Sequence, residues 1–295
     1  RPRRTYRMSC MHPHRYIDSD RKFRSWLASI PADQPAVAID IEAEFNLHIY
    51  GEHFCLLQVY DGTNAVAIDP QSVSIELIKE FLESRDRLKI TYDCSSDRLL
   101  LFRNHNIRLS TIIDLRPAVK LLEFQKQGLG AVLQEVLGIA PARAKERFQQ
   151  YDWTKRPIDP EALAYAIDDV VHLYRLHDEL LSRILKAGLL DRFLVENFRL
   201  QDRDPETDRE AGILRRGRKQ RLEPAQQELL TALHARREEV ARELNLPPNT
   251  VYPNRELLSV AVGERSPRQA QRSRNVPREA FDKLVRELED IVGGA

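Results

Sequence analysis

Apolar residues along the first two thirds of the chain follow two alternating patterns. Short runs rich in β-branched and other apolar residues predict strands, because strands are short and favour such side chains. We expect these strands at residues 36–41, 54–60, 65–69 and 88–92. Longer stretches with an apolar residue every three or four positions predict helices. We expect these helices at residues 73–84, 96–105 and 160–187.

The predicted helix at 160–187 has well-marked ends. Asp159 is a good N-cap residue, Pro160 fits the first turn, and Gly188 follows the last turn. Because strands come first and then alternate with helices, the pattern predicts an α/β fold, in which a mixed sheet is covered by helices on both faces.

The pattern changes near residue 199. Residues 199–221 are charged and have few large apolar side chains, so we interpret them as a linker. Helical spacing then returns and predicts a small all-α domain, with stretches at residues 222–245, 255–262 and 278–292. The expected parts are a basic, disordered leader at 1–20, an α/β domain at 21–198, the linker at 199–221 and a helical domain at 222–295.

Composition narrows the class of protein. The 295 residues carry 46 Lys and Arg against 45 Asp and Glu, so the net charge of +1 predicts no overall attraction to nucleic acid. The cysteines, Cys10, Cys55 and Cys94, form no C-x-x-C pair, which favours a reducing compartment and disfavours a thiolate zinc site. No apolar stretch approaches the about 20 residues of a membrane span, and the leader has no apolar signal core. We therefore expect a cytoplasmic protein.

Acidic residues occur inside the predicted strands and helices, where apolar side chains are expected. Side chains two apart on a strand share a face, so Asp40 and Glu42 project together while the apolar residues between them line the other side. On the long helix, Tyr165 and Asp169 are four residues apart and also share a face. Asp97 lies near the start of its own helix.

Each of these motifs, taken singly, has a simple alternative. A D-x-E pair at a strand end is often a solvated edge, and Tyr with Asp at this spacing is often an ordinary helix face. If the four carboxylates converge, each pair about 4 Å apart repels by roughly 4 kcal/mol at an effective dielectric near 20. Carboxylate oxygens suit Mg²⁺ or Mn²⁺ better than zinc. Two such ions about 4 Å apart can activate a water and stabilise the leaving oxygen of a phosphodiester.

The order of these motifs is similar to that of a known family. D-x-E on a first strand, a later Asp that opens a helix, and Y-x-x-x-D on a long helix resemble the DEDDy class of 3′–5′ exonucleases, and more closely the ribonuclease D family. Further similar stretches, which cover most of residues 36–181, are CLLQVYDG, AVAIDP, TIIDLRPAVKLL, GLGAVLQEVLG and FQQYDWTKRPIDPEALAYAIDDVVHLY. The helical tail from Leu222 to Val292 resembles the HRDC domain, which accompanies ribonuclease D and some helicases.

This resemblance implies a fold and a site. The implied fold is a ribonuclease H-like mixed sheet flanked by helices, followed by a small all-α HRDC-like domain. Residues 21–198 would form the DEDDy exonuclease domain. The implied metal-binding acids are Asp40, Glu42, Asp97 and Asp169, which would bind two divalent metal ions, Mg²⁺ or Mn²⁺. Tyr165 would position the attacking water rather than deprotonate it, because a tyrosine of ordinary pKa keeps its proton at neutral pH.

The resemblance also implies an activity. The chain would be a metal-dependent 3′–5′ exoribonuclease that releases nucleoside 5′-monophosphates from single-stranded RNA 3′ ends, with tRNA precursors and other stable RNAs as expected substrates. We expect no nucleotide cofactor, since the sequence has no P-loop. We also expect a monomer. Two alternatives stay open: a DNA 3′–5′ exonuclease, and a non-catalytic nucleic-acid-binding protein of the same fold.

Some residues depart from the pattern or add to it. Tyr92 stands where many relatives have His, and we expect the extra acids Glu44, Asp93 and Asp168 to be bystanders or to support the ligands. The basic segments at residues 215–221 and 265–278 are candidates for phosphate contact or for pairing within the protein. Candidates for core packing or for stacking on a terminal base are the aromatic residues Phe45, Tyr50 and Phe54.

Overall fold

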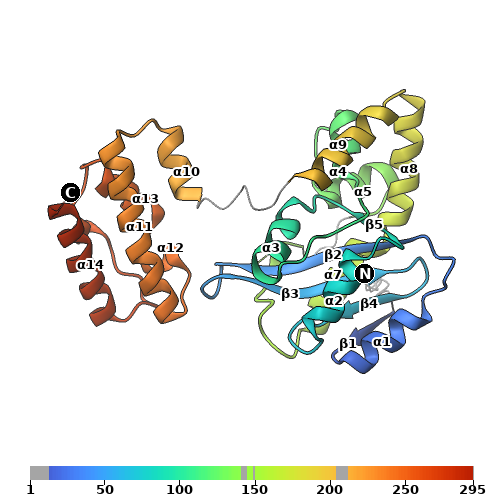
Figure 1. Ribbon diagram of the computed structural model, residues 1–295, viewed down its shortest axis with the longest axis horizontal. Helices are drawn as coiled ribbons and strands as arrows, with labels where there is room; N and C mark the ends of the chain where they lie inside the picture. Colours follow the sequence, from blue (N-terminus) through green and yellow to red (C-terminus); the bar gives the residue numbers. More distant parts are fainter. Residues whose placement is uncertain (1–12, 141–144, 149, 204–211, 295) are drawn as a thin grey trace, which may run out of the picture. The chain divides into compact units, whose positions relative to one another are not determined.

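The computed structural model describes residues 13–140, 145–148, 150–203 and 212–294 (Figure 1). These residues fall into two compact units. The first unit contains the sheet and the helices that cover it. The second contains the C-terminal helices together with residues 44–52, where the second strand turns into the third.

Among the described residues, six strands form one sheet in the order β1-β4-β3-β2-β5-β6. Their bounds are β1 His14–Ile17, β2 Ala36–Phe45, β3 Glu52–Tyr60, β4 Ala65–Ile68, β5 Leu88–Thr91 and β6 Ile112–Asp114. β1 runs parallel to β4, β4 runs antiparallel to β3, and β5 runs parallel to both β2 and β6. The sheet is therefore mixed, which confirms the predicted fold class.

Helices cover both faces of this sheet (Figure 1). Alternate residues of β2 show the division, because Val37 and Ile39 pack in one apolar core while Ala36 and Ala38 pack in the other. The helices of the first face are α1 Asp20–Ser29, α2 Ile75–Glu83 and α3 Ser95–His105. Those of the second face are α4 Arg116–Leu121, α5 Leu129–Leu137, α6 Lys145–Phe148, α7 Pro160–Val171, α8 Leu173–Lys186 and α9 Leu190–Asp202.

The predicted disordered leader, residues 1–20, contains strand β1. Residues 1–12 of this leader lie outside the described residues. The prediction of disorder does not hold for β1, because its residues pair with β4, from His14 opposite Ala65 onward. Ile17 is buried in the same core as Trp26 of α1, so apolar packing also holds this segment against the sheet. The sequence of β1, HRYI, is not an apolar run, so it gives no strand signal.

The stretch predicted as one helix, residues 160–187, is two helices that meet at His172. The apolar spacing does not reveal the break, because residues on both sides of it pack in the same core. The predicted ends are confirmed. The Asp159 side chain caps α7, and Gly188 follows α8 with a left-handed φ of 66°.

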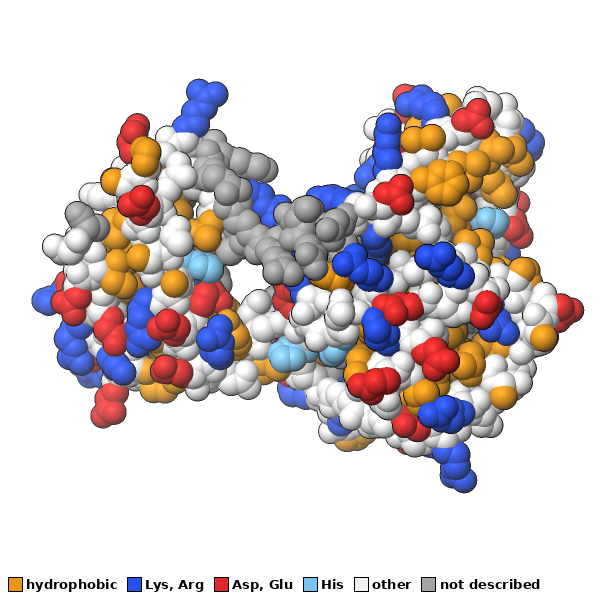
Figure 2. Space-filling view, in the orientation of Figure 1, with side chains coloured by type: hydrophobic (Ala, Val, Ile, Leu, Met, Phe, Trp, Pro, Cys, Tyr) orange, Lys and Arg blue, Asp and Glu red, His pale blue; other side chains and the backbone are white. Residues whose placement is uncertain are grey.

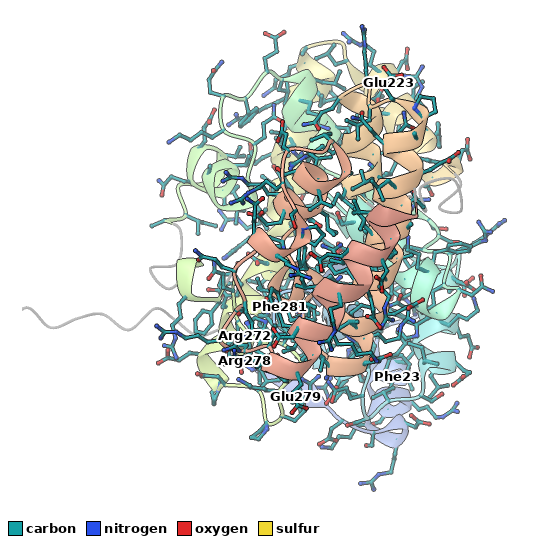
Figure 3. The ribbon with its side chains drawn as sticks, turned by 90° about the vertical axis from the view of Figure 1, so that its left-hand side faces the viewer. Phe23, Glu223, Arg272, Arg278, Glu279 and Phe281 are labelled. Atoms are coloured by element: carbon teal, nitrogen blue, oxygen red, sulfur yellow. The ribbon has the colours of Figure 1, made fainter. Side chains whose placement is uncertain are left out.

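The second unit is helical among its described C-terminal residues. Its helices are α10 Gly212–Lys219, α11 Pro224–Leu244, α12 Pro248–Val251, α13 Asn254–Ala261, the short 3-10 helix η2 Pro267–Gln269 and α14 Arg278–Gly293. The ring of Tyr252 is fully buried and stacks on Phe281 of α14, with 6.3 Å between ring centroids. Figure 3 looks onto this unit and shows Phe281 among the packed helices. The predicted helical stretches correspond to α11, α13 and α14.

The predicted linker, residues 199–221, overlaps the end of α9 and all of α10. Residues 204–211 of this stretch lie outside the described residues, so the predicted domain bounds stay a prediction. Within the described residues, no helix has the length and the hydropathy that a bilayer crossing requires.

Candidate active site

Strand β2 presents two carboxylates on one face of the sheet. Asp40 and Glu42 continue the row of Ala36 and Ala38, which pack in the core shared with α7 and α8. The residue between the two acids, Ile41, packs in the opposite core. The two acids therefore share a face, as the alternation along the strand predicts.

Helix α7 brings Tyr165 and Asp169 to this face. Small side chains let the helix approach the sheet closely, because Ala162 and Ala166 of α7 and Ala67 of β4 are all fully buried in one core. Tyr165 and Asp169 each stand three residues beyond one of these alanines, so they lie beside the surface of α7 that contacts the sheet.

Three carboxylates meet in one small space. One oxygen from each of Asp40, Glu42 and Asp169 lies within 4.8 Å of the other two. Ionised groups at this separation repel one another strongly, by roughly 4 kcal/mol for each pair about 4 Å apart at an effective dielectric near 20. The repulsion falls when the groups hold protons or when a cation lies between them.

Burial and neighbouring carboxylates raise the pKa values of Asp40 and Glu42. For Asp40 the pKa is well above its usual range, mainly because of burial, and the charges of Asp169 and Asp97 add to the shift. Burial and the neighbouring carboxylates raise the pKa of Glu42 in the same way. The pKa of the Tyr165 hydroxyl is also raised, first by burial, then by the charges of the three carboxylates and by a hydrogen bond with Asp169.

Asp97 lies in the first turn of α3 and does not belong to the group of three oxygens. Its charge still reaches that group, because it raises the pKa values of Asp40 and Glu42. The pKa of Asp97 itself is raised to about 7, first by burial and then by the charge of Asp114. The structure therefore brings Asp97 within electrostatic reach of Asp40 and Glu42, and Tyr165 within reach of the three clustered carboxylates.

Asp114, at the end of β6, supports Asp97 and is not among the residues that the sequence analysis predicted for the site. Its carboxylate accepts hydrogen bonds from the backbone N–H groups of Asp93 at 2.8 Å, Cys94 at 2.9 Å and Arg116 at 2.9 Å. Asp114 thereby fixes the turn from β5 into α3, on which Asp97 stands. An acid after a short apolar run is also typical of an ordinary turn, so the sequence signal for this role is weak.

An ion pair fixes the segment that leads into α7. Arg156 donates two hydrogen bonds to the buried Asp69, from Nε at 2.8 Å and from Nη2 at 2.7 Å. The Tyr16 hydroxyl donates to the same carboxylate at 2.6 Å, and Arg156 also donates to the carbonyl oxygens of Cys55 and Trp153. This geometry explains the D-W-x-x-R-P stretch, because its arginine ties the chain before α7 to the sheet.

The other residues that the sequence marked near the acids have local partners. Glu44 is buried and accepts hydrogen bonds from two backbone N–H groups of its own turn. Asp93 forms an ion pair with Arg116. Tyr92 donates a hydrogen bond to the carbonyl oxygen of Gln127 at 2.6 Å. Each of these side chains therefore has a structural role that needs no ligand.

The basic segment 265–278 is largely used within the helical unit. Its ion pairs are Arg265 with Glu256, Arg268 with Glu289 and Arg278 with Asp282. Arg272 donates to the carbonyl oxygen of Val276, and Figure 3 labels Arg272 and Arg278 at the end of the unit where α14 begins. These contacts favour intramolecular pairing over phosphate contact for this segment.

The three aromatic candidates differ in burial. Phe54 is buried in the core, which agrees with core packing. The side chain of Phe45 is 45% exposed, and Tyr50 is half-buried. Stacking on a terminal base stays a prediction for Phe45 and Tyr50.

The donor set fits a divalent metal ion. The group of Asp40, Glu42 and Asp169 offers carboxylate oxygens only, which are the ligands that hard cations such as Mg²⁺ and Mn²⁺ prefer. A cation between these oxygens would offset the repulsion that raises the pKa values of Asp40 and Glu42. Their positions on β2 and α7 keep them close together, as a metal site requires.

Two families of known proteins match this chain. A family described as 3'-5' exonuclease matches residues 15–185, and the HRDC domain matches residues 226–288. The first match spans more than half of the chain and includes all five predicted site residues. The chain belongs to the 3′–5′ exonuclease family, and with its HRDC domain it has the domain combination of the ribonuclease D group.

Curated relatives and solved structures agree with this placement. Ribonuclease D of Sphingobium indicum is 26% identical over 255 residues, which cover 85% of this chain and 64% of that protein. The catalytic core of RRP6 from Trypanosoma brucei superposes with a TM-score of 0.74 at 20% identity, covering 98% of this chain and 82% of that one. Escherichia coli RNase D superposes with a TM-score of 0.72 at 22% identity, covering 96% and 75%.

These structural likenesses establish the ribonuclease H-like fold of the exonuclease domain. The chain spans 64% of the length of the Sphingobium indicum ribonuclease D, which is less than two thirds. We therefore treat the activity, the substrates and the partners of a whole ribonuclease D as proposals for this chain.

Proposed function

We propose that this chain is a metal-dependent 3′–5′ exoribonuclease that releases nucleoside 5′-monophosphates one at a time. The observation that carries the proposal is the group of three carboxylates within 4.8 Å of one another, with Asp97 and Tyr165 in electrostatic contact with it. A fold that only binds nucleic acid gains nothing from such repulsion, because removing any one of these charges would relieve it.

Four residues would hold two divalent metal ions, Mg²⁺ or Mn²⁺: Asp40, Glu42, Asp97 and Asp169. When bound, such ions lower the pKa of water and stabilise charge on the leaving oxygen of a phosphodiester. The protein's part is to fix the ligands. β2 holds two of them at strand spacing, and the hydrogen bonds of Asp114 hold the turn before Asp97.

Tyr165 would orient the attacking water. Because the pKa of its hydroxyl is raised, the hydroxyl keeps its proton at neutral pH and acts as a hydrogen-bond partner rather than as a general base. The ring is held in place by Phe148 of α6, with 5.6 Å between ring centroids. A fixed ring allows the hydroxyl to direct the water along one line of attack.

RNA is the proposed polymer. The curated relatives carry the name ribonuclease D, and Escherichia coli RNase D is an exoribonuclease involved in structured RNA processing. By analogy, we propose single-stranded 3′ ends of structured RNAs, including tRNA precursors, as substrates, and trimming by a monomer. The HRDC domain supports a nucleic-acid partner, since it accompanies nucleic-acid enzymes in the proposed family.

A labelled-substrate assay tests this function. RNA labelled at its 5′ end, with an unpaired 3′ tail, is incubated with the protein in Mg²⁺, in Mn²⁺ or in a chelator, beside DNA of the same sequence. We expect a ladder that shortens from the 3′ end, with mononucleotide release, only when metal is present and faster on RNA. Faster shortening of DNA would make the chain a DNA exonuclease. Unchanged RNA binding without any shortening would make it a binding protein.

A further inference from the structure

The exonuclease unit has a second charged feature, a hollow of about 490 Å³ lined by four arginines. They are Arg85, Arg98, Arg108 and Arg203, and Asp202 is the one acid among the described lining residues. The hollow therefore carries four positive charges against one negative charge. Its volume lies within the range of about 300–1,000 Å³ that is usual for ligand sites.

Four separate parts of the chain supply these arginines. Arg85 lies between α2 and β5, Arg98 lies on α3, Arg108 lies between α3 and β6, and Arg203 follows α9. No run of basic residues in the sequence indicates this cluster, because only the fold brings the four positions together. Figure 2 shows Lys and Arg side chains on the visible face of this unit, with Asp and Glu side chains among them.

Neutral groups hold two of the guanidinium groups. Arg98 donates to the carbonyl oxygens of Leu200, Gln201 and Arg203, the last two at 3.0 and 3.5 Å. The guanidinium of Arg108 lies over the ring of Phe102, 4.5 Å from its centroid. Carbonyl oxygens and an aromatic ring orient these two cations. Arg108 also has an acidic neighbour, because its backbone N–H donates to the Glu83 carboxylate at 2.8 Å and the two charges attract each other.

Arginines that line one hollow repel one another. The arginines of the hollow and the acids of the active site are both clusters of like charge. A ligand of opposite charge stabilises a cluster of either kind.

The rest of the lining suits phosphate. Ser110, Thr111 and Gln201 bring hydroxyl and amide groups to the hollow, and such side chains, together with arginine, make most protein contacts to nucleic-acid phosphates. Guanidinium groups also match phosphate oxygens in a bidentate way. The lining thus favours a phosphodiester backbone over the carboxylates of an acidic peptide.

Most of the hollow lies away from the active site, although Arg98 directly follows Asp97 on α3. Arg85 precedes the first residue of β5, and Arg108 precedes β6, whereas Asp97 follows the other end of β5. Since β5 has four residues, its length alone separates the two ends by roughly 13 Å. A group bound in the hollow therefore lies away from the bond that the carboxylates would cleave.

We propose that this hollow is a second RNA-binding site, which holds backbone phosphates upstream of the 3′ end. The identity of the polyanion rests on the proposed exoribonuclease function, whereas the presence of an anion site does not. The hollow binds without sequence preference, because phosphate contacts carry no base information. It contributes to the binding of long RNA and not of oligomers that are too short to reach it.

Charge reversal at Arg85 tests the proposal on the whole chain. Arg85 is exposed, so Arg85→Glu removes a positive charge without opening the core. Arg24→Glu, at an exposed position of α1 outside the hollow, is the matched control. We measure KM and kcat on an RNA of about 20 nucleotides and on one of about 4 nucleotides. We expect Arg85→Glu to raise KM for the long RNA about tenfold more than for the short one, with Arg24→Glu like the wild type.

A binding experiment separates this proposal from the activity. In the background of Asp169→Asn, the affinity for fluorescent long RNA is measured against salt concentration. We expect Arg85→Gln to reduce the slope of log affinity against log salt by about 0.7, the value for one phosphate contact with a single strand. This result would stand even if the wild type cleaved no RNA, in which case only the proposed function would fail.

Two outcomes would overturn the proposal. In the first outcome, Arg85 substitutions change the KM for long RNA and the salt slope no more than Arg24→Glu does. The other is loss of inorganic tripolyphosphate binding in Arg85→Glu with long-RNA binding unchanged, which would assign the hollow to a small phosphorylated ligand. Thermal unfolding of both variants shows whether their folds are intact.

Discussion

Two clusters of like charge in the exonuclease unit are built in different ways. The carboxylates of Asp40, Glu42 and Asp169 stand on a strand and a helix, and their oxygens lie within 4.8 Å of one another. Burial and repulsion raise the pKa values of Asp40 and Glu42. The arginines of the hollow are spread over four segments, and neutral carbonyl oxygens or an aromatic ring orient two of them.

The difference reflects what each cluster would bind. A small divalent cation needs several oxygens within a few ångströms, so its ligands must come from elements that cannot move apart. A phosphodiester backbone is larger and tolerates donors at varied distances, so loops can supply them. The first arrangement suits chemistry at one bond, and the second suits holding a polymer of any sequence.

The largest expected effect comes from removing an acid. Asp97→Asn should lower kcat by more than about 100-fold, because loss of a metal ligand exceeds the 10- to 100-fold cost of losing a group behind a ligand. Steady-state kinetics with saturating Mn²⁺ measure this change, and circular dichroism checks the fold. Near-normal turnover would remove Asp97 from the site.

A smaller loss is expected when the water-orienting group is removed. Tyr165→Phe should lower kcat by about 10- to 100-fold with little change in KM, because the ring and its packing on Phe148 remain. The rate between pH 7 and 9 should show no fall caused by tyrosine ionisation, since the pKa of Tyr165 is raised. A variant that keeps full activity would show that the hydroxyl has no role.

A substitution at Asp114 tests whether its hydrogen bonds hold Asp97 in position. Asp114→Asn weakens the hydrogen bonds that fix the turn before Asp97, so the Mn²⁺ concentration for half-maximal activity should rise about tenfold. Excess Mn²⁺ should restore most of the rate, because the ligands themselves are intact. An equal loss at all Mn²⁺ concentrations would instead indicate a folding defect.

The raised pKa of Asp97 predicts how stability depends on pH without metal. Folding raises this pKa to about 7 from an ordinary value near 4, so the folded chain binds the proton more tightly than the unfolded chain does. Its contribution to the free energy of unfolding is complete below about pH 4 and is lost as the pH rises through about 7.

Asp97→Asn removes this pH dependence. In a chelator, the variant should gain stability relative to the wild type between pH 5 and pH 8, by at most about 4 kcal/mol. Urea unfolding at the two pH values measures the gain. Adding Mn²⁺ should stabilise the wild type more at pH 8 than at pH 5, and an identical pH profile in both proteins would contradict the assignment.

The smallest expected effect is on RNA binding, and it comes from combining a substitution in each of the two clusters. Arg85→Gln should weaken long-RNA binding a few-fold, and combining it with Asp169→Asn should give the sum of the two separate free-energy changes, because distant sites act independently. Fluorescence anisotropy measures all three variants in the same buffer. A clear departure from additivity would mean that the hollow and the carboxylates act as one site.

The sequence was sufficient for the elements whose side chains follow one period. Alternation along β2 predicted the shared face of Asp40 and Glu42, and helical spacing predicted the shared face of Tyr165 and Asp169. The break at His172 escaped prediction because apolar spacing continues through it. Strand β1 escaped because its sequence, HRYI, is not an apolar run.

Features that depend on long-range contacts could not be predicted. Asp114 acts through backbone N–H groups about 20 residues earlier in the chain, which a single sequence does not reveal. The arginines of the hollow are never adjacent in the sequence, whereas the conspicuous basic run 265–278 is largely paired within its own unit. Local charge density was therefore a poor guide to the basic surface.

Two neighbouring acids on α7 give the most direct test of the central claim. Asp169 belongs to the carboxylate group, whereas Asp168 lies about 100° around the helix from it. The measurement is shortening of 5′-labelled RNA from its 3′ end in Mn²⁺ by Asp169→Asn and by Asp168→Asn. We predict that Asp169→Asn loses this shortening while Asp168→Asn stays close to the wild type. Equal activity in the two variants would contradict it.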